Sequence, residues 1–323
     1  MLSTTSPSNL NNTSSSSYSY LKEKNEINRD SDRILKWFLQ RNLRLSERIL
    51  ANAYFRKNEN PMFADIISNI LLTQKRKDAI YQIYETELAA GFTLPSVLTR
   101  AEIELKIGRP LPNSFPIALR AQGCASLLWR PKVAIIGARH PTFYGREQAF
   151  RFAKAISEAG CLVISGGAIG IDTVVNETAF KYGASAAVLG GGLKSLYPAS
   201  NEGLFCQMRK SQNGLLISEF ADDMRPQKWS FPQRNHTLAL LADFLLVVEA
   251  TCTSGSLITA NAALDCGIDL GAIPGPVNSP LSAGTHSLLR SGAFCIHEPQ
   301  DVLERTLSLA QMRKSILNQQ AKL

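Results

Sequence analysis

Short apolar runs alternate with longer amphipathic stretches between residues 132 and 273. The apolar runs occupy residues 133–136, 161–164, 186–189, 215–217, 244–248 and 270–273. Apolar residues recur at helical spacing at 145–159, from 173 onward, at 201–209 and at 256–265. Apolar strands that alternate with amphipathic helices are typical of a parallel sheet covered on both faces. The pattern therefore predicts an α/β fold, an extended Rossmann-like parallel sheet with helices on both faces.

The first third of the chain follows a different pattern. Residues 1–20 are rich in Ser, Asn and Thr and contain few apolar residues, which is typical of disorder. Helical spacing then appears at 31–57, 62–71 and 80–88, which predicts a small helical module before the sheet. The predicted domains are a disordered low-complexity tail at 1–30, a helical N-terminal module and linker at 31–128, the Rossmann-like domain at 129–298 and a C-terminal helix at 299–323.

Glycine and serine follow several of the predicted strands. The residues at these turns are Gly137 and Arg139, then Ser165, Gly166 and Gly167, and later Ser254, Gly255 and Ser256. In an open parallel sheet, the loops at the carboxyl ends of the strands line one crevice, and the following helices direct free N–H groups into it. Small residues let a phosphate approach the backbone closely. These turns are therefore candidate phosphate-binding positions.

A basic and aromatic stretch, QKWSFPQRNH at 227–236, lies between two of the apolar runs. We expect it to form a loop that suits a flexible anion with flat faces, as single-stranded nucleic acid is. The candidate contacts are Lys228, Phe231, Arg234 and Asn235. The alternative is a surface loop whose Trp229 and Phe231 tuck into the core. For Arg234 a second alternative is pairing with Glu249 or Glu219, which would hold the loop in shape.

Composition and charge favour an anionic partner and a reducing compartment. The chain of 323 residues has a formal net charge of +8. Its six cysteines form no CxxC pair and its four histidines are scattered, so we expect no metal site and no cofactor. We interpret the cysteines as small buried hydrophobes. Without a signal-like segment or a long apolar run, we expect a cytoplasmic protein with no membrane contact.

Catalytic motifs are missing from the glycine-rich turns. A full G-x-G-x-x-G does not follow the first strand, and neither a Walker lysine motif nor a G-x-S-x-G turn is present. Asp172 is a candidate catalytic residue, but it lies where a helix N-cap is expected, and we interpret it as a cap. Glu249 ends a strand beside the crevice, where it either positions a ligand or makes a structural hydrogen bond. The sequence thus predicts binding without catalysis.

Several segments together resemble one known family and keep its order. They read VAIIGARHPT at 133–142 with Tyr144-Gly145, SGGAIGID at 165–172, LGGG at 189–192 with Tyr197-Pro198, SEF at 218–220, FPQRN at 231–235, VVEA at 247–250, SGSLITA at 254–260, and PGPV at 274–277 with Gly284-Thr285. On these residues the chain from about 132 to 298 resembles the DNA-processing protein A family, also called DprA or Smf.

The resemblance implies a Rossmann-like domain that binds single-stranded DNA and forms a homodimer. Members protect incoming DNA and load the recombinase RecA during natural transformation. By motif position, Arg139 resembles the family's phosphate-gripping arginine, and Lys228 and Phe231 resemble its basic contact and its base-stacking aromatic. Two positions depart from the family: Ile169 stands where many members carry Arg, and Asn261 often corresponds to Arg in relatives.

Two other functions stay open at this point. Related Rossmann-like nucleotide phosphoribohydrolases use a Pro-Gly-Gly-x-Gly-Thr turn followed by a catalytic Glu. Here the equivalent turn reads Thr253-Ser254-Gly255-Ser256, and no Glu follows in the helix. The other alternative is a non-catalytic scaffold that docks partners through the N-terminal helices and the C-terminal tail.

Overall fold

The computed structural model describes residues 97–116 and 118–320. These residues belong to one compact unit that runs from Ser96 to Leu323. The predicted disordered tail and the helices predicted at 31–57, 62–71 and 80–88 lie outside the described residues.

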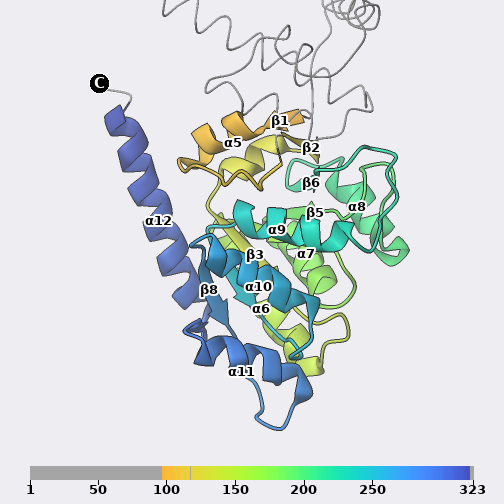
Figure 1. The fold of residues 1–323 in the computed structure, drawn as a ribbon, viewed down its shortest axis with the longest axis vertical. Helices are drawn as coiled ribbons and strands as arrows, with labels where there is room; N and C mark the ends of the chain where they lie inside the picture. Colours follow the sequence, from red (N-terminus) through yellow and green to blue (C-terminus); the bar gives the residue numbers. More distant parts are fainter. Residues whose placement is uncertain (1–96, 117, 321–323) are drawn as a thin grey trace, which may run out of the picture. The chain divides into compact units, whose positions relative to one another are not determined.

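The described chain alternates strands and helices around one sheet (Figure 1). The strands are β1 (Val97–Thr99), β2 (Ala118–Gly123), β3 (Lys132–Ile136), β4 (Leu162–Ser165), β5 (Ala184–Val188), β6 (Gly214–Ser218), β7 (Phe244–Val247), β8 (Asp269–Ala272) and β9 (Phe294–Cys295). The α-helices are α5 (Arg100–Ile107), α6 (Phe143–Glu158), α7 (Ile171–Tyr182), α8 (Glu202–Met208), α9 (Ser230–Leu241), α10 (Gly255–Asp265), α11 (Ala283–Arg290) and α12 (Pro299–Gln320). The predicted α/β fold is confirmed.

The sheet has the strand order β1-β2-β6-β5-β4-β3-β7-β8-β9. From β6 to β9 all neighbouring strands are parallel, as predicted. At the other edge β2 pairs antiparallel with both β1 and β6. The sheet therefore begins before residue 129, where we expected the domain to start. The pattern did not reveal β2 because its sequence, ALRAQG, lacks a continuous apolar run.

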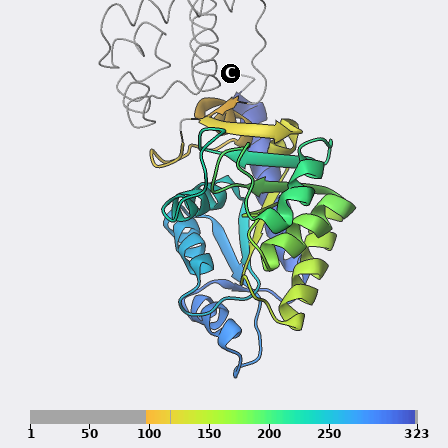
Figure 2. The same cartoon turned by 90° about the vertical axis from the view of Figure 1, so that its right-hand side faces the viewer.

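Both faces of the parallel sheet are buried because consecutive residues of a strand point to opposite sides. In β3, Val133 and Ile135 pack into the cluster formed with α6, α7 and α12. Ala134 and Ile136 pack into the cluster formed with α9 and α10. Figure 2 shows the sheet between these two layers of helices. This alternation explains why the apolar runs are continuous in the sequence.

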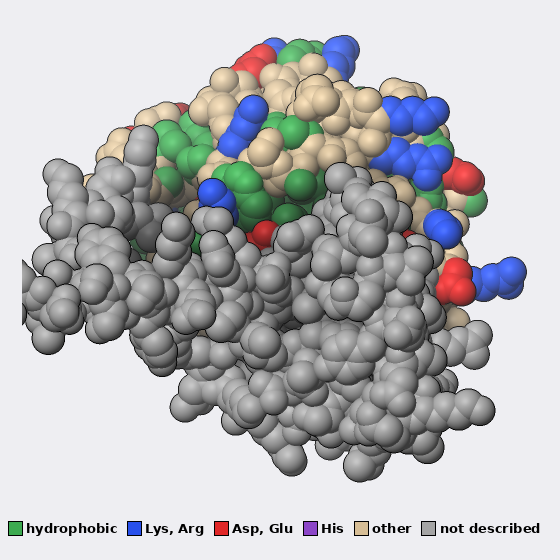
Figure 3. All heavy atoms as spheres, turned by 90° about the horizontal axis from the view of Figure 1, so that it is seen from above, with side chains coloured by type: hydrophobic (Ala, Val, Ile, Leu, Met, Phe, Trp, Pro, Cys, Tyr) green, Lys and Arg blue, Asp and Glu red, His purple; other side chains and the backbone are tan. Residues whose placement is uncertain are grey.

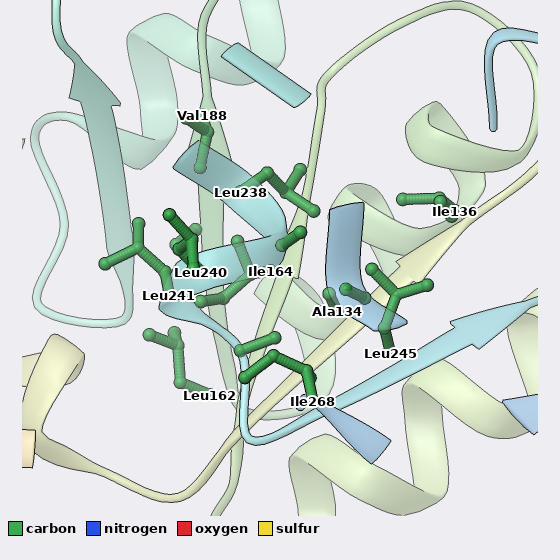
Figure 4. Packing of buried hydrophobic residues seen from close by; sticks show 14 of the residues in the cluster. Ala134, Ile136, Leu162, Ile164, Val188, Leu238, Leu240, Leu241, Leu245 and Ile268 are labelled. Carbon is green, nitrogen blue, oxygen red and sulfur yellow. The ribbon is translucent and has the colours of Figure 1, made fainter. Parts of the chain in front are cut away.

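The core on the α9 and α10 side is shown from close by in Figure 4. Leu162, Ile164 and Leu245 from the sheet meet Leu238 and Leu241 from α9, and each is at most 1% exposed. Burying an aliphatic side chain of this size stabilises the fold by about 1.5–3 kcal/mol. Helix α9, which carries the candidate arginine, is thus fixed against the sheet by its apolar face.

The cysteines do not share one environment. Cys161 is buried as expected, and burial raises the pKa of its thiol to about 11. Cys252 and Cys295 are exposed, so the interpretation as small buried hydrophobes is wrong for these two. Cys252 lies in the turn between β7 and α10, and Cys295 is the last residue of β9.

The surface of the described part is basic without being uniformly so. Lys and Arg side chains recur across the described part of the face seen from above, with Asp and Glu side chains between them (Figure 3). Among the described residues, no helix is long and apolar enough to cross a membrane. The described residues also contain no group of three or more His, Cys, Asp or Glu arranged to hold a metal ion.

Candidate nucleic-acid interface

The candidate site lies where the chain connections of the sheet reverse direction. Strand β3 is flanked by β4 on one side and by β7 on the other. Loops that leave such a pair of strands in opposite directions open a crevice at their carboxyl ends, where open α/β sheets bind ligands. A cavity of about 310 Å³ occupies this position. Its walls come from the turns after β3 and β4, from α9 and from the N-terminus of α10.

The turn after β3 brings Gly137 and Arg139 to the cavity. A Cβ at Gly137 would lie 2.7 Å from the Ile171 side chain, so this position has no space for a larger residue. The hydroxyl of Ser256 donates to the Gly137 carbonyl at 2.9 Å and joins this turn to α10. Arg139 is exposed, and its guanidinium carbon lies 6.0 Å from the centre of the Phe231 ring. The turn thus presents an exposed cation beside a half-buried aromatic ring.

The turn after β4 contributes backbone rather than side chains. Gly166 lines the cavity, and Gly167 has a φ of 68°, which favours glycine. Ser165 is fully buried, and its hydroxyl donates to the Ile135 carbonyl at 2.7 Å. Of the three residues predicted here, Ser165 therefore holds β3 and β4 together and does not line the cavity.

Asp172 is not the N-cap of the helix after this turn. The N-cap of α7 is Gly170, and Asp172 lies in the first turn of that helix. Its carboxylate accepts a hydrogen bond from the Ala168 N–H at 3.2 Å and faces the Arg234 guanidinium. An acidic side chain in the first turn is favoured by the helix dipole. The N-cap role predicted for Asp172 is therefore wrong. Its proximity to Arg234 could not be predicted, because the two residues are 62 positions apart in the sequence.

Arg234 lines the cavity, but nearly all of its side chain is buried. It is 5% exposed, and its guanidinium donates to the carbonyls of Gly166 and Val188 and to the Asn235 amide oxygen. Among the described residues, Arg234 forms no ion pair, either with Glu249 or with Glu219. The carboxylate that attracts it most strongly is Asp172, and Glu219 attracts it more weakly. Burial lowers the pKa of Arg234, and the negative charge of Asp172 partly raises it again. Burial raises the pKa of Asp172, and the positive charge of Arg234 partly lowers it again.

The stretch at 227–236 is only partly a loop. Helix α9 begins at Ser230, so Phe231, Arg234 and Asn235 are helical. Pro232 falls in the first turn, where its missing N–H needs no partner. Ser230 is fully buried, and its hydroxyl accepts from the Gln227 N–H at 3.0 Å and donates to the Gly190 carbonyl. The sequence around Pro232 resembles a turn, which explains why the helix start was not predicted.

Phe231 separates the main cavity from a smaller one of about 50 Å³. Tyr197 lines the smaller cavity, is 53% exposed, and lies with its ring centre 5.9 Å from that of Phe231. Gly190 lies so close that a Cβ there would be 2.8 Å from the Phe231 ring. Tyr197 belongs to one of the family segments but is not among the predicted site residues. Its place in the sequence, shortly after the glycine-rich turn at 190–192, is the signal from which a role at the site could have been predicted.

The start of α10 completes the wall opposite α9. Ser254 caps this helix by accepting from the Ser256 N–H at 3.2 Å, and Ser254, Gly255 and Ser256 all line the cavity. Glu249 makes a structural contact, since its carboxylate accepts from the N–H and hydroxyl of Thr142, the N-cap of α6, at 2.9 and 2.5 Å. Glu249 is not among the described residues that line the cavity, so it is not placed to contact a ligand there.

The comparison with protein families gives a match to DNA recombination-mediator protein A over residues 107–307. The chain belongs to this family. It is 38% identical to Protein Smf of Escherichia coli over 193 residues, which is 59% of this chain and 51% of that protein. It is 36% identical to the DNA processing protein DprA of Bacillus subtilis over 191 residues, which is 58% of this chain and 64% of that protein. The chain therefore matches about half to two thirds of these relatives.

Solved structures of DprA agree with the fold of this chain. DprA from Streptococcus pneumoniae superposes with a TM-score of 0.64 at 29% identity, over 80% of this chain and 92% of that one. DprA from Helicobacter pylori superposes with a TM-score of 0.56 at 32% identity, over 62% of this chain and 94% of that one. The latter structure concerns the single-stranded DNA binding mode of that protein.

Lys228 and Ile169 of this DprA-family chain lie outside the main cavity. Lys228 is exposed and lines neither cavity. Ile169 is 37% exposed and lines the smaller cavity. It gives this wall an apolar side chain at the position where many members carry Arg. Trp229 is 58% exposed and contacts Phe220 edge to face, so it is not tucked into the core. Asn261 is exposed on α10.

Proposed function

We propose that this chain binds single-stranded DNA in the crevice between the turns of β3 and β4 and the helices α9 and α10. The observation that carries the proposal is the position of Arg139 above Phe231 at the mouth of the cavity. A cation and an aromatic face side by side suit a phosphate followed by a base. The DprA of Helicobacter pylori, whose single-stranded DNA binding mode has been described, supports the choice of ligand.

Each part of the crevice would have a distinct role in binding. Arg139 and the backbone N–H groups at Gly166 and at the start of α10 would receive phosphates. Phe231 would stack against a base, with Tyr197 at its edge, and stacking contributes about 1–3 kcal/mol per base. Lys228, on the exposed approach to α9, would contact a neighbouring phosphate. Arg234 would act indirectly, because it fixes Gly166 and α9 in place.

The wider role that we propose follows the family. The chain would protect incoming single strands and help load RecA during transformation or recombination, as a homodimer in the cytoplasm. We propose binding without catalysis because the acidic side chains around the crevice are already engaged. Asp172 faces Arg234, and Glu249 accepts from Thr142.

The test is a fluorescence titration of matched single-stranded and double-stranded oligonucleotides over a salt series. We expect preference for the single strand and an affinity that falls steeply with salt, because bound phosphates release counterions. Arg139→Ala should weaken binding and lower the slope of log affinity against log salt by about 0.7 for one lost phosphate contact. Lys210→Ala is the matched control, since Lys210 is exposed and lines neither cavity.

Three outcomes would count against the proposal. Equal affinity for both forms of DNA would contradict recognition of single strands. Wild-type affinity of Arg139→Ala would show that the ligand lies elsewhere on the surface. Release of free base from AMP would favour the phosphoribohydrolase alternative instead.

A further inference from the structure

A second cavity, of about 490 Å³, lies at the opposite end of the parallel strands from the DNA crevice. It opens beside the first residue of β3, Lys132, and the residue before β7, Asp243. Helix α5 and the middle of α12, residues 307–313, form its sides, with Lys106 from α5 and Arg313 from α12. Its size falls within the range of about 300–1,000 Å³ that is typical of small-molecule sites.

The wall of this cavity carries more positive than negative charge. Its cations are Lys106, Arg130, Lys132 and Arg313, and Asp243 is the single acidic residue among the described residues that line it. Asp243 is 3% exposed and is shared by two of the cations. Lys132 Nζ lies 3.4 Å from its Oδ2, and Arg313 pairs with its Oδ1. One carboxylate therefore cannot balance the charge around it.

A fifth cation adds to the imbalance from behind the wall. Arg109 donates to the carbonyls of Leu240 and Ala242, while its Nε is buried without a hydrogen-bond partner. Burial lowers the pKa of Arg109, and the nearby charge of Arg313 lowers it further. Burial also lowers the pKa of Lys132, against the attraction of Asp243. Buried charges that lack a counter-charge are costly, so a bound anion would stabilise this arrangement.

The rest of the lining is apolar and includes one flat ring. Trp129 is half-buried at the cavity, and Ile107 and Leu307 also line it. Indole faces stack on nucleobases, and this contact does not depend on base sequence. The cavity therefore combines a surface for an aromatic group with cations for a phosphate.

We propose that this cavity is a second ligand site that binds a nucleoside phosphate, with the phosphate at Lys106, Arg130 and Arg313 and the base against Trp129. The ligand is a free nucleotide or the phosphorylated end of a nucleic-acid strand, which share this chemistry. The site is independent of the crevice at the carboxyl ends of the strands. Because Arg313 belongs to α12, the bound phosphate would also hold this helix against the sheet.

The experiment is isothermal titration calorimetry of the full chain with AMP, adenosine and inorganic phosphate. The test variant is Lys106→Ala/Arg130→Ala, because both side chains are exposed and their removal leaves the Lys132–Asp243–Arg313 group intact. We expect AMP to bind the full chain and to bind this variant about tenfold more weakly, which corresponds to ~1.4 kcal/mol. Lys210→Ala, which removes one exposed charge elsewhere, should bind AMP as the wild type does.

A second titration distinguishes a free nucleotide from a phosphorylated strand end as the ligand. It also distinguishes binding in this cavity from binding in the crevice. A 5′-phosphorylated oligonucleotide is titrated into Arg139→Ala/Phe231→Ala, in which the crevice is disabled, with and without the Lys106→Ala/Arg130→Ala change. Weaker binding on adding that change supports the site with a strand end as its ligand, even where AMP alone does not bind. The proposal is wrong if neither AMP nor the oligonucleotide depends on Lys106 and Arg130. It is also wrong if inorganic phosphate binds as tightly as the ligand that depends on Lys106 and Arg130, or if Trp129→Leu leaves the affinity for that ligand unchanged.

Discussion

Arg234→Ala is expected to destabilise the fold rather than merely remove a ligand contact. The guanidinium is 5% exposed and its partner Asp172 is 7% exposed, so the pair lies almost entirely out of water. Removing the arginine leaves a buried carboxylate without its counter-charge. It also takes a hydrogen-bond donor from the carbonyl of Gly166, which lines the crevice, and from that of Val188 at the end of β5.

The size of the effect follows from the burial of the pair. Leaving a buried charge uncompensated by removing its nearby counter-charge costs about 3–5 kcal/mol. For a unit of about 150–250 residues, each kcal/mol lowers Tm by about 2–4 °C, so Arg234→Ala should lower Tm by about 6–20 °C. Arg139→Ala removes an exposed arginine from the same crevice and should change the free energy of unfolding by at most about 0.5 kcal/mol.

The assay is urea unfolding of the full chain at pH 7 in a double-mutant cycle of Asp172→Asn and Arg234→Gln. Because the two side chains share one interaction, the double variant should be less destabilised than the sum of the single variants. We expect a difference of about 0.5–3 kcal/mol. The reasoning is refuted if Arg234→Ala unfolds like the wild type and loses only DNA affinity. Strict additivity of the two single changes would refute the pairing itself.

Three further predictions concern stacking, pH and thiol reactivity. Phe231→Ala should weaken single-strand binding by about 1–3 kcal/mol at every salt concentration without changing the salt slope, whereas Phe231→Trp should retain most of the affinity. Burial raises the pKa of Glu219 above its ordinary 4.5, so the folded state holds this proton more tightly than the unfolded state. Stability should therefore fall as pH rises from 4.5 through the folded pKa, and Glu219→Gln should flatten this dependence in urea unfolding between about pH 4.5 and 7. With a thiol-specific disulfide reagent, exposed Cys252 and Cys295 should react quickly, and Cys161 should react only on unfolding.

Each of these predictions has a contradicting result. A lower salt slope for Phe231→Ala would mean that the ring positions a phosphate contact instead of stacking. A pH dependence unchanged in Glu219→Gln would assign that dependence to other carboxylates. Mass spectrometry identifies the labelled cysteines, and rapid labelling of Cys161 in the native protein would show that the sheet opens there.

The repeating pattern predicted the α/β architecture because each buried strand and each amphipathic helix leaves a local signal. The parallel strands from β3 to β8 and the helices α6, α7 and α10 lie within a few residues of the predicted ranges. Strand β2, which lies between β1 and β6, left no such signal, since Arg120 and Gln122 interrupt its apolar residues. The start of α9 was hidden by Pro232, which is as common in turns as in first helical turns.

The site was predictable only where its chemistry follows a strand directly. Gly137, Arg139, Gly166 and Ser256 line the cavity because the ends of parallel strands meet at one edge of a sheet. The pairing of Asp172 with Arg234 joins segments that are distant in sequence, and no local pattern encodes it. The contacts of Ser165 and Glu249 were equally hidden, because a buried hydroxyl and a ligand-binding one look alike in a sequence.

The lining of the crevice at the carboxyl ends of the strands is scattered along the chain, from Ile136 to Leu281, which are 145 residues apart. During synthesis β3 leaves the ribosome before the other strands that border the crevice. Its neighbour β7 and the start of α10 follow only after β4, β5 and β6. At about 5–20 residues per second, about 7–30 s separate the first wall of the crevice from the last. A nascent chain therefore has no complete crevice in that interval, and ligand binding would report that translation has passed Leu281.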